Sequence, residues 1–131
     1  MGGFTFGAWA TLGTASQSIA AASSHAFGAV DNAGKTSTEV SVEVTYAGAG
    51  ETAGADIIIE REYVGTPAYE ATAGAPWTIP LPFLAGATYQ RVITVPADMA
   101  GDFQVRVRNN QEATHACTVT VRTRQSTYSA T

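Results

Sequence analysis

Thr36-Ser-Thr-Glu-Val-Ser-Val-Glu-Val-Thr-Tyr46 is the stretch of this 131-residue chain that decides its fold class. Apolar and polar side chains alternate along it. The apolar positions are Val40, Val42, Val44 and Tyr46, and the polar positions between them are Glu39, Ser41, Glu43 and Thr45. Successive side chains of a strand point to opposite faces, so this pattern predicts a β-strand with one buried and one solvent-facing side. The β-branched and aromatic residues of the buried side pack well on a pleated surface.

Other short runs of the chain also favour strands. The predicted strands are 14–22, 25–30, 56–64, 88–95, 103–108 and 116–124. Residues 47–55 are a glycine-rich loop, and residues 65–84 hold four of the five prolines. Because proline cannot donate to a ladder, 65–84 is predicted to be loop or an extended segment along a sheet edge. Short strands joined by glycine or proline loops predict an all-β, antiparallel β-sandwich, either immunoglobulin-like or jelly-roll.

The sequence divides into an N-terminal arm or edge strand at 1–13, a β-sandwich domain at 14–124 and a flexible, polar C-terminal tail at 125–131. The first segment is glycine-rich and carries Phe4, Phe6 and Trp9. Three large aromatic side chains are costly to leave in water. Two interpretations follow: a first strand that packs on the domain, or an arm that docks on a neighbouring subunit.

The bulk composition narrows the class of protein. Hydrophobic residues make up 45% of the chain, which indicates a globular protein, and charged residues only 14%, which suits a surface covered by partners. The net charge of −4 argues against a nucleic-acid binder, and no apolar run is long enough for a membrane helix. The single Cys117 cannot form an intrachain disulfide, and no Lys or Arg precedes Lys35, so a soluble protein made in the cytoplasm is expected.

The last two predicted strands, 103–108 and 116–124, are expected to form a hairpin over a polar loop. In both strands the apolar residues are odd-numbered, so opposed residues must sum to an even number. That register places four arginines on one solvent-facing side: Arg106, Arg108, Arg122 and Arg124. The acidic residues expected to share a face of the earlier hairpin are Glu39, Glu43, Glu60 and Glu62. The two stripes are either solvated faces or complementary surfaces between subunits or toward a larger partner.

Catalytic and ligand-binding motifs are weak. Residues 29–36 match a relaxed phosphate-loop pattern, but Thr36 is predicted to open a strand rather than a helix, so a turn at 31–34 is favoured. His25 and His115 stand alone, and a structural zinc site takes four ligands. Cys117 alternates with valines and is predicted to be a small buried hydrophobe. No catalytic residue, cofactor or metal is therefore predicted.

Two stretches carry a resemblance to known families. The run from Ser16 through His25-Ala26-Phe27-Gly28-Ala29-Val30-Asp31-Asn32 into an alternating strand and a glycine loop resembles small β-sandwich virion proteins of tailed bacteriophages, such as capsid decoration (cement) and tail-associated proteins. The run 98–107 is similar to the turn that enters strand F of immunoglobulin-like domains, with 115–123 as strand G. The phage resemblance implies a non-enzymatic, oligomeric protein.

The sequence thus leads to a virion structural protein, and specifically to a capsid decoration protein that binds and stabilises the shell. Its partners would be the major capsid protein or other virion proteins and further copies of itself, in virions assembled in the host cytoplasm. The candidate partner-binding residues are Phe4, Phe6, Trp9, Trp77, Arg106, Arg108, Arg122 and Arg124. The alternative is a receptor- or glycan-binding module of a tail or fibre, with Trp77, Tyr69 and Trp9 as stacking platforms.

Overall fold

The computed structural model describes residues 2–46, 53–63, 68–71, 77–84, 86–98, 101–111 and 115–129, and these form an all-β fold. The strands are β1 (Gly3–Phe6), β2 (Ala10–Ile19), β3 (Ser24–Asp31), β4 (Ser37–Tyr46), β5 (Ala55–Arg61), β6 (Thr78–Pro80), β7 (Thr88–Pro96), β8 (Asp102–Asn109) and β9 (Cys117–Ser129). In this part of the chain, no helix is long and apolar enough to cross a membrane.

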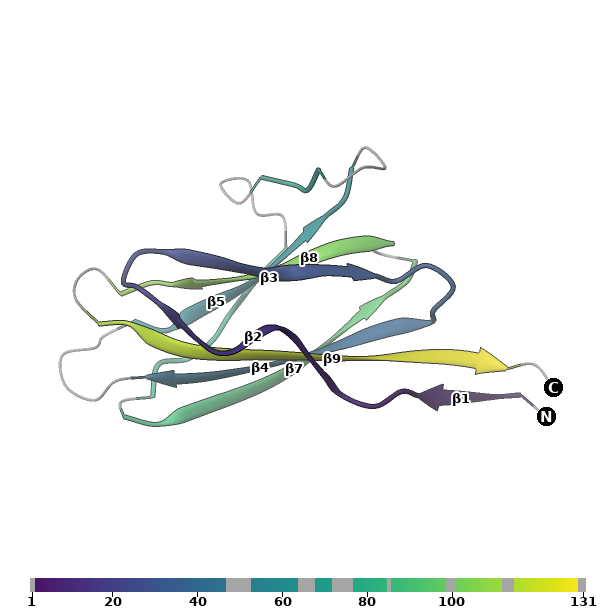
Figure 1. Cartoon of the computed structure of the whole chain (residues 1–131), viewed down its shortest axis with the longest axis horizontal. Helices are drawn as coiled ribbons and strands as arrows, with labels where there is room; N and C mark the ends of the chain where they lie inside the picture. Colours follow the sequence, from purple (N-terminus) through teal and green to yellow (C-terminus); the bar gives the residue numbers. More distant parts are fainter. Residues whose placement is uncertain are drawn as a thin grey trace.

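Two antiparallel sheets pack face to face as a sandwich (Figure 1). The first has the order β2-β9-β4-β7, with β1 beside β2 on the same edge of β9, and the second has the order β3-β8-β5-β6. Leaving β1 aside, successive strands along the chain lie in opposite sheets, except β5 and β6, which lie in the same sheet. Eight strands arranged in this order form a jelly roll. An immunoglobulin sandwich would place its last two strands side by side in one sheet. Of the two predicted sandwich types, the connectivity is therefore that of a jelly roll.

The organising strand is confirmed at the centre of the first sheet. β4 pairs with β9 on one side and with β7 on the other, over its whole length. Its side chains Val40, Val42 and Val44 are fully buried and Tyr46 nearly so, while the intervening residues face outward. The apolar alternation of this strand therefore sets which face of the sheet becomes the core.

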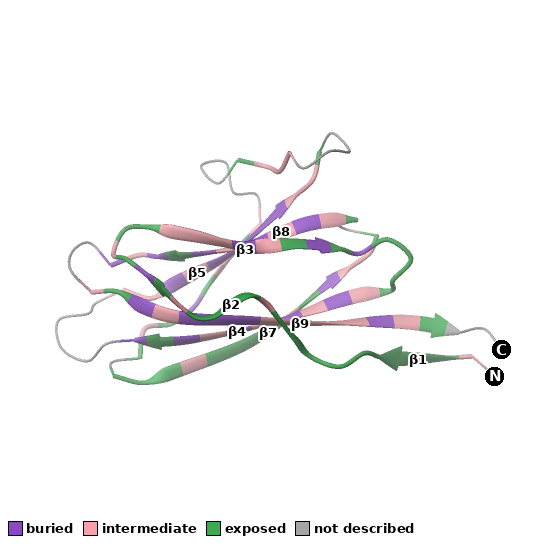
Figure 2. Cartoon of the chain, in the orientation of Figure 1, coloured by how far each residue is buried: buried purple, intermediate pink, exposed green. Residues whose placement is uncertain are grey.

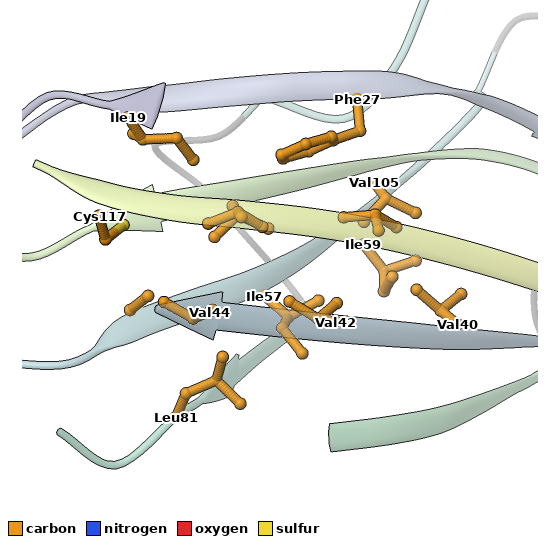
Figure 3. Packing of buried hydrophobic residues seen from close by; sticks show 14 of the residues in the cluster. Ile19, Phe27, Val40, Val42, Val44, Ile57, Ile59, Leu81, Val105 and Cys117 are labelled. Carbon is orange, nitrogen blue, oxygen red and sulfur yellow. The ribbon is translucent and has the colours of Figure 1, made fainter. Parts of the chain in front are cut away.

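The core lies between the two sheets, and Figure 3 shows side chains from both meeting there. Phe103, Val105 and Val107 of β8 and Val119 and Val121 of β9 are fully buried, as their alternation predicts. Cys117 joins them as a buried side chain, which confirms its prediction as a small core residue. The other members of the core cluster are Ile19, Phe27, Val30, Val40, Val42, Val44, Tyr46, Ala55, Ile57, Ile59, Leu81 and Val95.

The predicted hairpin between the last two strands is wrong. β8 pairs with β3 and β5 in one sheet, whereas β9 pairs with β1, β2 and β4 in the other. The four-arginine stripe is thus divided, with Arg106 and Arg108 on one sheet and Arg122 and Arg124 on the other. The prediction that the four glutamates share one face of an earlier hairpin is also wrong, because β4 and β5 lie in opposite sheets. Both errors arise because strands adjacent in the chain need not pair with each other.

The C-terminal tail is also corrected. Residues 125–129, predicted to be frayed, continue β9 without interruption, and Ser126 is buried. Backbone pairing with both β1 and β4 holds them, so polar composition alone was a poor guide. At the other end, residues 3–6 form an edge strand, one of the two interpretations of the arm, while β2 begins already at Ala10.

The extended segment predicted from the proline-rich region is confirmed in its described part. β6 pairs with β5 at the sheet edge, and Leu81 enters the core. Trp77, Ile79 and Phe83 are partly buried and pack against it. Pro67 and Pro76 and most of the glycine-rich loop 47–55 lie outside the described residues.

A close approach of β2 to β3 explains one glycine. The register of β2 on β9 shifts between Leu12 and Gln17, and Gly13 in this bulge has a positive φ of 69°. A Cβ added at Gly13 would overlap the carbonyl oxygen of Phe27. Only glycine therefore allows β2 to bulge between its two stretches of pairing with β9 and pass this close to β3.

Candidate interaction surface on the terminal strands

The two ends of the described chain lie together. β1 pairs antiparallel with the end of β9, from Gly3 opposite Ser129 to Phe6 opposite Ser126, and Gly7 N donates to Gln125 O at 2.9 Å. Figure 1 shows this pair running out at one end of the sandwich, past the turn that joins β3 to β4. We call residues 3–9 together with residues 124–129 the terminal ribbon. Its position leaves both of its faces accessible.

The terminal ribbon carries an unusual share of exposed aromatic surface. Phe4 is 61% exposed, Phe6 54%, Trp9 38% and Tyr128 57%. Every residue of β1 is exposed, as the green strand in Figure 2 shows. Among the described residues, only three other large hydrophobic side chains are exposed: Tyr63, Leu84 and Val92. Exposed apolar groups gathered in one place mark an interaction site more often than scattered ones do.

Arg124 contacts two of these aromatic rings. Its guanidinium carbon lies 4.7 Å from the ring centroid of Phe6 and also 4.7 Å from that of Trp9, within the range of cation–π attraction. Its Nε donates to Glu39 Oε1 at 2.8 Å, so β4 anchors the guanidinium. The charge of Arg124 is thus neutralised within the chain, and the surface above it is aromatic rather than cationic.

A second aromatic pair extends this surface toward the end of the ribbon. The rings of Phe4 and Tyr128 meet edge to face, with centroids 5.3 Å apart. Phe4 and Tyr128 lie directly opposite each other in the β1–β9 ladder, so the pairing of the two strands keeps their rings in contact. The geometry favours an aromatic surface that is formed before any partner arrives, which lowers the ordering cost of binding.

A groove lies on each face of the ribbon. The groove on the aromatic side has a volume of about 350 Å³, and its lining residues are Phe4, Phe6, Thr36, Ser37, Glu39, Thr94, Arg124 and Ser126. The groove on the opposite side has a volume of about 400 Å³ and is more polar, lined by Thr5, Gly7, Ala8, Ala10, Lys35, Thr123, Arg124, Gln125 and Thr127. Both are open, so they suit an extended surface contact better than an enclosed small molecule.

Of the eight residues singled out from the sequence, the structure brings four together: Phe4, Phe6, Trp9 and Arg124. Trp77 is partly buried against the core, on the segment that leads into β6. Arg106 Nε donates to Glu60 Oε1 at 3.0 Å on the second sheet, and Arg108 is exposed there. Arg122 lies 3.9 Å from Glu43.

The acidic and basic residues therefore meet within one chain. Glu39 faces Arg124, Glu43 faces Arg122 and Glu60 faces Arg106. The stripes were predicted as surfaces that either face solvent or complement a second subunit. Three members of each stripe instead form ion pairs across neighbouring strands, so these charges are less available for steering a partner.

Tyr128 is the residue of the ribbon that sequence reasoning missed. It stands in the segment assigned to the flexible tail, although it keeps the parity of Arg122 and Arg124. Extending that alternation by two more residue pairs would have placed it on the same face.

The other motifs considered from the sequence form ordinary structural features where they are described. Ala33 N donates to Asp31 Oδ1 at 2.8 Å and Lys35 N to Asn32 O at 3.1 Å, so the phosphate-loop match forms the predicted turn, followed by a strand. His25 stacks edge to face on Phe27 at 4.9 Å. No group of three or more His, Cys, Asp or Glu side chains within the described ranges could hold a metal ion.

One carboxyl pair is unusual. Asp31 and Asp102 lie opposite each other where β3 and β8 pair. A hydrogen bond that the protonated Asp102 carboxyl donates to the Asp31 carboxylate, helped by desolvation and by the nearby negative charge, raises the pKa of Asp102. Asp31 is exposed at the end of β3 and Asp102 is half-buried at the start of β8, so the pair is interpreted as a local electrostatic feature.

Comparison with known proteins adds no relative: no family model, no curated protein and no solved structure matches this chain.

Proposed function

We propose that this chain is a non-enzymatic structural protein of a tailed-phage virion, a capsid decoration protein that binds the assembled shell through its terminal ribbon. The observation that carries the proposal is the gathering of Phe4, Phe6, Trp9 and Tyr128 in exposed positions around Arg124. Its partners are the major capsid protein or other virion proteins, and further copies of itself. A protein that binds only the assembled state stabilises that state by mass action.

The fold is compatible with this role without requiring it. Jelly rolls occur in viral capsid proteins and in lectins, and one fold serves many functions. The argument therefore rests on the site. Burying a phenylalanine side chain contributes roughly 1.5–3 kcal/mol before ordering costs. The rings of the ribbon are already positioned by Arg124 and by each other, so less of that gain is lost on docking.

The test is binding of variants to particles that lack the protein. Phe4→Ser combined with Phe6→Ser removes two exposed rings without touching the core, so the melting temperature should stay close to that of the unchanged chain. Co-sedimentation with shells assembled from the major capsid protein of the same phage should fall at least tenfold. Tyr63→Ser is the matched control, because Tyr63 is 67% exposed but lies away from the ribbon.

Two results would count against the proposal. Purified virions that contain no copy of this chain by mass spectrometry would remove its basis. Equal co-sedimentation of the ribbon variant, the Tyr63 variant and the unchanged chain would show that the aromatic surface is not the docking surface.

A receptor- or glycan-binding module is the second candidate, and one observation favours it. Trp9 is 38% exposed, and its neighbours Ala8 and Ala10 line the polar groove together with threonines and Gln125. An exposed indole is suited to stacking on a sugar ring, and hydroxyl and amide groups are suited to bonding the sugar hydroxyls. This candidate predicts that saccharides change the tryptophan fluorescence of the chain and that Trp9→Ala abolishes the change. The decoration role predicts no saturable change.

A further inference from the structure

The strand β7 forms one edge of the first sheet, and its outer side is open. It pairs with β4 along its whole length, from Ser37 opposite Pro96 to Thr45 opposite Thr88. Within the residues that the structure describes, no strand pairs with its other side. The residues on it are accessible: Val92 is 51% exposed, and Thr88, Gln90, Arg91 and Thr94 are exposed as well.

The backbone groups that face this open side can be identified. At the two ends of the ladder, Tyr46 N donates to Ala87 O at 3.1 Å and Ala97 N donates to Thr36 O at 3.0 Å. Hydrogen-bonded and non-hydrogen-bonded pairs alternate along an antiparallel ladder. The odd-numbered residues of β7 therefore bond to β4, and the N–H and C=O groups of Thr88, Gln90, Val92 and Thr94 point away from it.

This edge has little of the protection that proteins give to an exposed strand. Such strands are usually blunted by lysines, prolines, bulges or inward-pointing charges. β7 contains no lysine, its register with β4 is unbroken, and its one proline is its last residue. Arg91 is its one charged residue; it lies opposite the buried Val42 and so on the inner face of the sheet, where its Nη1 donates to Pro80 O at 3.4 Å. This inward-pointing charge is the one such protection on the strand, and the outer face of β7 itself carries no charged side chain.

We infer that the free edge of β7 pairs antiparallel with the same edge of a second copy of this chain, about a two-fold axis at Val92. In this register Val92 lies opposite Val92 of the second copy, Gln90 opposite Thr94, and Arg91 opposite Ile93. All three outward-facing residues near the centre then exchange backbone hydrogen bonds, and two exposed valines cover each other.

The side chains of β7 disfavour the two neighbouring two-fold registers. Moving the axis by one residue to Arg91 would place two arginines directly opposite each other, which is unfavourable. Moving it to Ile93 would place Pro96 opposite Gln90, where a backbone donor is needed. With the axis at Val92, Pro96 falls opposite Thr88 at the end of the ladder instead. In this register valine lies opposite valine at the centre, and Gln90 lies opposite Thr94 on the same face. A second copy of the chain supplies that sequence without any further partner.

Cysteine cross-linking tests the register. In a hydrogen-bonded antiparallel pair the Cα atoms are about 5.5 Å apart, within the roughly 4.4–6.8 Å that a disulfide spans. Val92→Cys should form a covalent dimer under mild oxidation. Thr94→Cys is the matched control, since its own counterpart would lie roughly 13 Å away at about 3.3 Å per residue. The native Cys117 is buried and is kept in both variants.

Sedimentation velocity tests whether the dimer forms, and the decisive measurement uses two variants with opposite charges at position 92. The unchanged chain should sediment at twice its mass of 13.6 kDa. Val92→Lys and Val92→Glu should each sediment as monomers with an unchanged melting temperature, and an equimolar mixture of the two should restore the dimer.

An unchanged chain that sediments as a monomer would overturn the inference and leave this edge to a strand of a different protein. Cross-linking of Thr94→Cys as readily as Val92→Cys would also overturn it. The inference does not rest on the decoration role: a chain that dimerises through β7 but does not bind shells would sustain this inference and refute that role, and the reverse result would do the opposite.

Discussion

Arg124 Nε donates a hydrogen bond of 2.8 Å to Glu39 Oε1 while its guanidinium lies against the rings of Phe6 and Trp9. One side chain of β9 thus ties the central strand β4 to the segment around the exposed strand β1. The relationship makes the terminal ribbon part of the folded domain instead of a loose arm, and it determines how the ribbon should respond to mutation.

Arg124→Ala should loosen the ribbon at small cost to the whole fold. A partly exposed ion pair and an exposed cation–π contact each contribute about 0.5–1 kcal/mol, so a loss of roughly 1 kcal/mol in the free energy of unfolding is expected. Trp9 should become more accessible to iodide in fluorescence quenching. The control is Arg108→Ala on the other sheet, where Arg108 is exposed. Equal quenching in both variants would contradict the role assigned to Arg124.

The face assignment of β4 is tested by Val42→Asp against Glu43→Gln. Val42 is fully buried, so an unpaired carboxylate there should lower the free energy of unfolding by several kcal/mol. Glu43 lies on the outer face, accepting a hydrogen bond from Gln90 Nε2 at 2.9 Å, and its replacement should cost less than about 1 kcal/mol. Urea denaturation measures both, and similar losses would mean that the two faces are confused.

Two glycines with nearly the same backbone angle separate steric contact from backbone strain. Gly13 has φ of 69° and Gly34 has φ of 72°, yet a Cβ at Gly34 meets nothing within 4 Å, whereas one at Gly13 would overlap Phe27 O. Gly34→Ala should cost about 1–2 kcal/mol from the left-handed conformation alone. Gly13→Ala should cost clearly more, because β2 must also move away from β3. Thermal melting of the two variants decides, and equal losses would refute the close approach.

The Asp31–Asp102 pair predicts a specific dependence of stability on pH. The pKa of Asp102 is raised above its ordinary value, so the folded state holds this proton more tightly than the unfolded state does. The resulting stabilisation is fully present below the ordinary pKa of 3.8 and is lost as the pH rises through the raised value. Asp102→Asn removes the carboxyl that loses this stabilisation.

The Asp102→Asn variant should therefore melt at or above the temperature of the unchanged chain at neutral pH, and this advantage should shrink as the pH falls toward the ordinary carboxyl range. Asp98→Asn serves as the control for removing one negative charge from the neighbouring turn region. A pH dependence that is the same in both variants would show that the Asp31–Asp102 contact does not govern it.

The buried side of a strand could be predicted better than the strand that lies next to it. Alternation in 36–46, 103–108 and 116–124 assigned Val42, Val105 and Val119 to the core, and all three are fully buried. The pairing of β8 with β9 was predicted wrongly, although the alternation within each strand was right. For the candidate surface, Phe4, Phe6 and Trp9 were identified as aromatics that need a partner, but neither the pairing of β1 with β9 nor the contribution of Tyr128 was predicted.

The sequence by itself determined which side of β4, β8 and β9 is buried, because in these strands that property depends on the order of apolar and polar residues along a few successive positions. Only the tertiary structure decided which strands are neighbours. In a sandwich the inner faces of both sheets are equally apolar, so the alternation of β9 would suit pairing with β8 or with β4 alike. Loop closure, the bulge at Gly13 and the packing of two sheets settle that choice, and they act between residues far apart in the chain. The same non-local contacts set Arg124 against Glu39 and make two distant ends of the chain into one surface.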